Sequence, residues 1–142
     1  MKHILFVGLV ALATINGLAA DRLDNKSLRG DWMLVKGEVG GQAMSEATVK
    51  TISMKLGDGK YHVLVAGAPD IGTYEIDSAA KPKGMVIKGT EGPNKGRTIP
   101  AIYEVEGKTL RICYDLSGAK RPAEFKSLPG TRLYLATYQR KE

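Results

Sequence analysis

The feature that most constrains this chain is a succession of short segments in which apolar and polar residues alternate, with a tight turn after nearly every segment. Strict alternation places every second side chain on one face of a β-strand. The clearest example has Ile52 to Leu56 and Tyr61 to Val65 on either side of Gly57-Asp58-Gly59. Such a turn between two alternating runs is typical of a β-hairpin. The sequence therefore predicts an antiparallel sheet.

About eight such strands follow one another from Trp32 to Tyr138, and a short helix fits only between Gln42 and Lys50. Because most connections are short, consecutive strands are expected to lie side by side. Closure of this meander into a barrel would remove its unpaired edges. We therefore expect an all-β fold, a small antiparallel up-and-down β-barrel. The interior of such a barrel is wide enough to be filled by side chains or to hold one small ligand.

The first residues are typical of an export signal and not of the barrel. Lys2 precedes a mostly apolar stretch from Ile4 to Ile15, and small residues then offer cleavage after Ala19 or Ala20. The apolar stretch is too short for a transmembrane helix, which needs about 20 apolar residues. We expect a signal peptide at residues 1–20, one domain at residues 21–142, no integral membrane span, and a periplasmic or extracellular location.

The amino-acid composition narrows the classes of partner. Cys113 is the one cysteine, so no disulfide can form within the chain. The formal net charge is +6, but the lysines and arginines are scattered along the sequence and form no basic stripe with interleaved aromatic residues. Nucleic-acid binding is therefore not expected.

Several motifs resemble those of lipocalin-like proteins. Gly30-Asp31-Trp32 is similar to the Gly-x-Trp opening of lipocalin-like barrels. A longer match resembles an uncharacterised lipocalin-like paralogous domain family first described in Planctomycetes, and the resemblance covers about Leu28 to Arg140. It is carried by Gly92-Pro93-Asn94-Lys95-Gly96, Ile102-Tyr103-Glu104-Val105-Glu106-Gly107, Thr109-Leu110-Arg111-Ile112-Cys113-Tyr114 and Arg121-Pro122-Ala123-Glu124-Phe125-Lys126-Ser127.

The resemblance implies structural roles and no established activity. In lipocalins the tryptophan closes one end of the barrel and an arginine near the chain end packs on it. This implies such roles for Gly30, Trp32 and Arg140, with Arg132 as the rival arginine. A plug is the favoured role for Trp32, with a cavity wall as the alternative. No long C-terminal helix like that of well-known lipocalins is expected in this sequence.

The candidate ligand-binding residues are four tyrosines and one arginine. Tyr61, Tyr74, Tyr103 and Tyr114 fall in the apolar phase of their strands, which predicts hydroxyl groups inside the barrel. The alternative is that the rings lie at the barrel ends with their hydroxyls in water. Arg111 falls in the polar phase and is expected outside, unless a wet barrel makes it the partner of an anionic head group.

Catalytic and metal sites find little support. His62 is the only histidine after the signal segment, and its strand phase predicts an exposed side chain. Cys113 is expected to be a buried, inert thiol instead of a nucleophile paired with His62. Glu104 and Glu106 share a strand face beside a turn, as a solvated strand end would. We therefore expect no enzyme activity, metal or cofactor.

Two functions fit these observations. The first is an exported carrier that binds a small lipophilic or amphipathic molecule inside the barrel. The second is a non-catalytic recognition module that binds an envelope protein or polymer through its loops, chiefly Ala66 to Ile71, Glu91 to Gly96 and Ser117 to Ala123.

Overall fold

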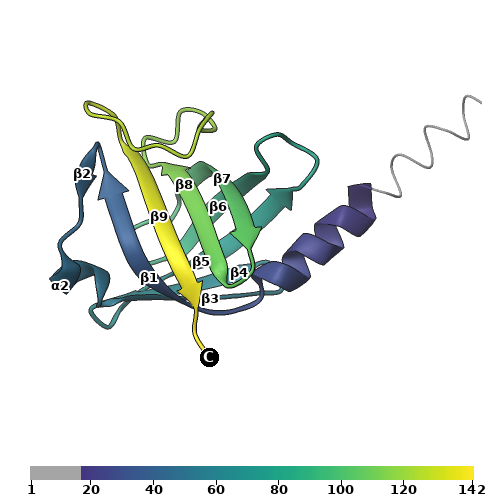
Figure 1. Ribbon diagram of the computed structural model, residues 1–142, viewed down its shortest axis with the longest axis horizontal. Helices are drawn as coiled ribbons and strands as arrows, with labels where there is room; N and C mark the ends of the chain where they lie inside the picture. Colours follow the sequence, from purple (N-terminus) through teal and green to yellow (C-terminus); the bar gives the residue numbers. More distant parts are fainter. Residues whose placement is uncertain (1–16) are drawn as a thin grey trace, which may run out of the picture.

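The computed structural model describes residues 17–142, which form a closed antiparallel β-barrel (Figure 1). Each strand of the wall pairs with the next along the chain, and β1 also pairs with β9, which closes the barrel. The strands of the wall are β1 (Gly30–Val39), β3 (Ile52–Gly57), β4 (Lys60–Val65), β5 (Ala68–Asp77), β6 (Gly84–Glu91), β7 (Thr98–Glu106), β8 (Thr109–Asp115) and β9 (Leu133–Arg140). The predicted small lipocalin-like barrel is confirmed.

The β3–β4 hairpin shows how local sequence sets this fold. Asp58 and Gly59 both have positive φ, 54° and 74°, as a two-residue turn of the type favoured in hairpins requires. The turn fixes the register so that Leu56 lies opposite Tyr61, and both side chains are buried inside the barrel. The neighbouring His62 is exposed, as its phase predicts.

A short excursion separates β1 from β3. It contains β2 (Gln42–Ala43), which pairs with the end of β1, and α2 (Glu46–Val49). The Ser45 hydroxyl accepts a hydrogen bond from the Thr48 backbone N–H at 3.2 Å and caps α2. The helix thus begins within the range that the sequence left open for one.

The long loop between β8 and β9 packs on part of the outer wall, which the alternation pattern alone did not predict. Ile102 and Cys113 lie opposite each other on β7 and β8, are 0% exposed, and are not part of the inner core cluster. The Cys113 thiol donates a hydrogen bond to the Lys126 carbonyl at 3.6 Å. The outer face of β8, expected to be polar, is therefore partly a second buried layer.

A helix precedes the barrel and touches one of its ends. Residues 17–28 are helical, and Leu28, its last residue, is fully buried against the core cluster. Most of the predicted signal peptide, residues 1–16, lies outside the described residues. Within residues 17–142, no helix has the length and apolar character needed to cross a membrane.

Candidate functional site

Trp32 and Arg140 close the end of the barrel that faces the N-terminal helix, residues 17–28. The indole of Trp32 is 1% exposed, and its Nε1 donates to the Leu28 carbonyl at 2.9 Å. The Arg140 guanidinium lies 4.2 Å above the Trp32 ring and donates to the carbonyls of Arg29 and Ser27 at 2.6 and 2.5 Å. Arg140, and not Arg132, is thus the arginine on the tryptophan. Its cation–π contact joins β9 to β1, and its hydrogen bonds join β9 to the segment at the end of the N-terminal helix.

Gly30 fits the same arrangement because of its backbone. Its φ is +136°, and a Cβ at this position would lie 2.5 Å from Nη1 of Arg140. A larger residue would therefore strain the backbone and displace the guanidinium. We call Gly30, Trp32, Arg140 and the last turn of the N-terminal helix the closed end.

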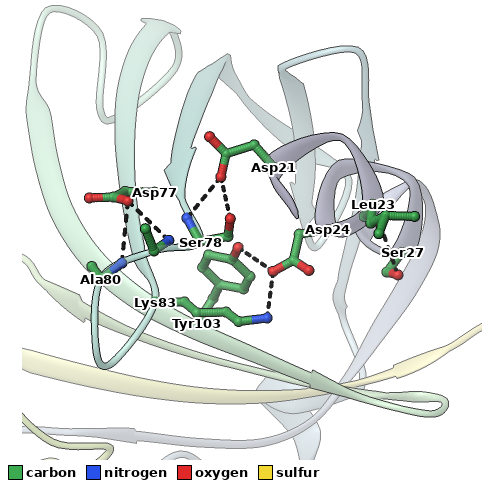
Figure 2. A network of polar contacts seen from close by, with 10 residues as sticks. Asp21, Leu23, Asp24, Ser27, Asp77, Ser78, Ala80, Lys83 and Tyr103 are labelled. Atoms are coloured by element: carbon green, nitrogen blue, oxygen red, sulfur yellow. Dashed lines mark hydrogen bonds and ion pairs between the residues drawn. The ribbon is translucent and has the colours of Figure 1, made fainter. Parts of the chain in front are cut away.

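Two aspartates of the N-terminal helix extend the closed end, as Figure 2 shows. Tyr103 donates its hydroxyl to Oδ2 of Asp24 at 2.7 Å, and the Lys83 ammonium binds the same oxygen at 2.8 Å. One turn earlier, Asp21 accepts from both the backbone N–H and the hydroxyl of Ser78. Burial and the Asp24 carboxylate raise the pKa of Tyr103, so its hydroxyl stays protonated as a donor. These bonds fasten the helix to the barrel.

Three of the five predicted ligand-binding residues lie away from any central cavity. Tyr103 points to the helix, and Tyr74 borders a surface depression beside Asp58 at the same end. Arg111 lies on the outer wall, where it binds Glu104 at 2.7 and 2.9 Å and stacks 4.6 Å above the Phe125 ring. Tyr74 and Tyr103 are buried in the barrel core, as their phase predicts, but they do not line the cavity, because strand phase gives direction and not height along the barrel axis. Arg111 lies outside, as its polar phase predicts, and not beside a ligand head group.

A cavity of about 300 Å³ occupies the other half of the barrel. Most of its lining is apolar, and Tyr61 and Tyr114 are the predicted residues that reach it. Val39 and Val65 also line it and are 39% and 40% exposed, so this end opens to solvent. The full lining is Val39, Met44, Thr48, Ile52, Met54, Leu56, Tyr61, Val63, Val65, Asp70, Met85, Ile87, Asn94, Ile99, Ile112, Tyr114, Leu116, Tyr134 and Tyr138.

One side of this open end is polar. Asp70 accepts a hydrogen bond from the Tyr61 hydroxyl at 3.2 Å and another from the Asn94 amide at 2.7 Å. Arg97 donates to the amide oxygen of Asn94 at 3.1 Å and to the Leu116 carbonyl. The carboxylate is therefore held in place by neutral donors, while the Arg97 guanidinium binds the other atom of the Asn94 amide.

Three more tyrosines from β8 and β9 adjoin this polar side. The hydroxyls of Tyr114 and Tyr138 are 3.3 Å apart, and the rings of Tyr114 and Tyr134 stack with centroids 5.3 Å apart and planes 19° from parallel. Burial is the main cause that raises the pKa of all three. Their hydroxyls are therefore neutral at physiological pH. We call Tyr61, Tyr114, Tyr134 and Tyr138 the tyrosine cluster.

Sequence reasoning missed Asp70, Asn94, Tyr134 and Tyr138. Asp70 falls in the segment Ala66 to Ile71, predicted to be a loop, whereas β5 begins at Ala68. Its phase is the signal that could have found it, since Asp70, Gly72 and Tyr74 alternate in one strand. Tyr134 and Tyr138 share their phase with the fully buried Ala136 on β9 in the same way.

The residues considered for catalysis lie apart from the cavity. His62 is exposed on β4, and Glu104 is paired with Arg111 outside the barrel. Burial raises the pKa of the Cys113 thiol, which disfavours the nucleophilic thiolate. Within residues 17–142 no group of three or more histidine, cysteine, aspartate or glutamate side chains is placed to hold a metal ion.

Comparisons with protein-family models, curated proteins and solved structures find no match to this chain.

Proposed function

We propose that this protein is a non-catalytic carrier whose barrel binds a small lipophilic or amphipathic molecule at its open end. The observation that carries the proposal is the cavity of about 300 Å³, which is largely apolar and bordered on one side by Asp70, Asn94 and the tyrosine cluster. Binding pockets for small molecules commonly begin near this volume and combine an apolar lining with a few convergent polar groups. The apolar walls favour burial of a hydrocarbon part, and the polar side orients the ligand.

Export is part of the proposal. A signal peptide at residues 1–20, cleaved after Ala19 or Ala20, would deliver the barrel to the periplasm or the extracellular space. Cleavage there would leave Asp21 and Asp24 in place, so the contacts with Ser78 and Tyr103 support a mature chain that keeps its closed end. We also propose that the chain belongs to the lipocalin-like family first described in Planctomycetes, on the basis of Gly30-Asp31-Trp32 and the longer motifs between Gly92 and Ser127.

A second candidate function is recognition of an envelope protein or polymer by the loop between β8 and β9. This loop borders an outer depression of about 610 Å³. Four basic side chains line it, and an acidic polymer would suit them. They are Lys120, Arg121, Lys126 and Arg132. Asp115 and Glu124 line the same depression and reduce its positive charge, so we favour the carrier.

Native mass spectrometry of the protein purified gently from its own envelope extract tests the carrier. A matched pair of variants separates the cavity from the surface. Val63→Trp places an indole in the cavity, whereas Leu64→Trp places one on the outside of the same strand, where Leu64 is 37% exposed. We expect a stoichiometric small molecule on the wild type and on Leu64→Trp, and none on Val63→Trp.

The contrary result is a bare protein mass for the wild type that stays bare after single-chain amphiphiles are added. That outcome would contradict the carrier function and favour recognition through the loop between β8 and β9. Binding of an acidic polymer that is lost in Lys120→Glu/Arg121→Glu would then support the recognition module.

A further inference from the structure

The charge of the cavity is set by a single residue. Among the described residues that line it, Asp70 alone carries a formal charge at neutral pH. Its carboxylate is half-buried and receives two hydrogen bonds, from Tyr61 and Asn94. A carboxylate offers about four acceptor positions, so these two donors do not saturate it. The cavity therefore presents a fixed negative charge that still has capacity for a partner.

Arg97, which binds Asn94, does not supply that partner. Arg97 is not among the lining residues, and its guanidinium binds Asn94 and the Leu116 carbonyl. Its hydrogen bond to Asn94 turns the amide N–H toward Asp70. Arg97 thus orients the neutral amide of Asn94, and its own positive charge is not among the groups that line the cavity.

Aromatic rings surround the same space. The tyrosine cluster lines the cavity with Asp70, and its members Tyr114 and Tyr134 are stacked. The face of an aromatic ring carries negative partial charge and attracts cations, with quaternary ammonium groups as the best-known ligands of such sites. The phenols remain neutral because burial raises the pKa of Tyr61 and Tyr114. The rings and the carboxylate therefore favour the same sign of ligand charge.

The remaining lining is suited to a hydrocarbon tail. Met54, Met85, Ile99 and Ile112 are all buried and line the cavity. Methionine side chains adapt their shape to apolar ligands, and burial of each methylene of a tail favours binding. An elongated ligand could thus place its tail among these side chains and its head group beside Asp70.

We propose that the cavity selects amphipathic cations, which are short-chain amines or quaternary ammonium compounds, with the cationic head between Asp70 and the tyrosine cluster. This inference rests on the carrier function proposed above. Anionic amphiphiles such as fatty acids are disfavoured, because their head group would meet the Asp70 carboxylate at short range.

The test is isothermal titration of the mature protein with three amphiphiles of one chain length, each below its critical micelle concentration. The probes are octyltrimethylammonium, 1-octanol and octyl sulfate. We expect octyltrimethylammonium to bind at least about tenfold more tightly than 1-octanol, and octyl sulfate to bind most weakly. Asp70→Asn keeps the shape of the side chain and should remove the preference for the cation while leaving 1-octanol affinity within about twofold.

Asp58→Asn is the matched control, because Asp58 lies at the closed end in the exposed ion pair with Arg29. It should leave all three affinities unchanged. Equal affinities of the wild type for octyltrimethylammonium and 1-octanol would overturn the cation inference and leave the carrier standing. Failure of the wild type to bind any of the three probes would overturn both proposals.

Discussion

The two ends of the barrel use the same residue types for opposite purposes. At the closed end, Trp32 and Tyr103 point inward, and each polar atom finds a fixed partner in the helix formed by residues 17–28. At the open end, inward tyrosines bind one another and Asp70 around a cavity of about 300 Å³. The difference teaches that alternation decides which side chains face inward, whereas the segment that covers an end decides whether they form a plug or a binding site.

The largest expected effect comes from removing the plug. Trp32→Ala deletes a fully buried indole together with its hydrogen bond to Leu28 and its contact with Arg140. We expect a loss of about 3–5 kcal/mol in the free energy of unfolding. Urea denaturation followed by circular dichroism measures it. A loss below about 1 kcal/mol would mean that the closed end is not a packed plug.

A smaller effect is expected from the bond that fastens the helix. Asp24→Ala leaves the buried Tyr103 hydroxyl without its acceptor, which should cost about 1–3 kcal/mol of stability. Asp58→Asn removes the charge of Asp58 from its exposed ion pair with Arg29 and still suits the positive φ of the turn, so it should change stability by less than about 1 kcal/mol. Denaturation of the two variants side by side makes the comparison. Equal losses would show that the helix contact adds nothing specific.

Larger side chains should destabilise the packed half of the barrel more than the half that contains the cavity. Leu110 is 0% exposed and does not line the cavity, so Leu110→Phe should overpack the core and cost about 1–3 kcal/mol. Val63 lines the cavity, so Val63→Phe has room and should cost less than about 1 kcal/mol. Thermal unfolding of both variants gives the ranking, and the reverse order would argue against an open half.

The smallest predicted effect concerns single hydroxyl groups. Tyr114→Phe removes one hydroxyl from the cavity and should weaken binding of octylammonium, whose N–H groups can donate to that hydroxyl, by about threefold to tenfold. Tyr103→Phe removes a hydroxyl at the closed end and should leave that affinity unchanged while lowering stability by about 1 kcal/mol. Titration and denaturation of each variant provide both readouts. Loss of affinity in Tyr103→Phe alone would place the ligand at the closed end and contradict the proposed site.

Much of the barrel could be predicted because alternation and turn chemistry are local. The Gly57-Asp58-Gly59 turn places Leu56 opposite Tyr61, and such registers follow once a turn is recognised. The burial of Cys113 was expected, but the outer loop that contacts it could not be predicted in this way, since the segment around Lys126 has no regular structure.

The candidate site was predicted in part, for a related physical reason. Strand phase correctly predicted that Tyr61 and Tyr114 face the cavity. It also correctly predicted that Tyr103 faces inward, but Tyr103 lies at the closed end of the barrel, away from the cavity. The position of a side chain along the barrel axis depends on the registers of all the strand pairs together, and its surroundings depend on the helix that covers one end. Asp70 was missed because Gly67 and Pro69 suggested a loop where the strand had already begun.

The most direct test of the account is a methyl NMR titration of isoleucine-labelled protein with octyltrimethylammonium. Four isoleucines line the cavity, namely Ile52, Ile87, Ile99 and Ile112, and their signals should shift together and saturate. The signal of Ile102, buried on the outer wall, should stay in place. Unchanged cavity signals, or shifts confined to Ile102, would contradict a binding site inside the open end.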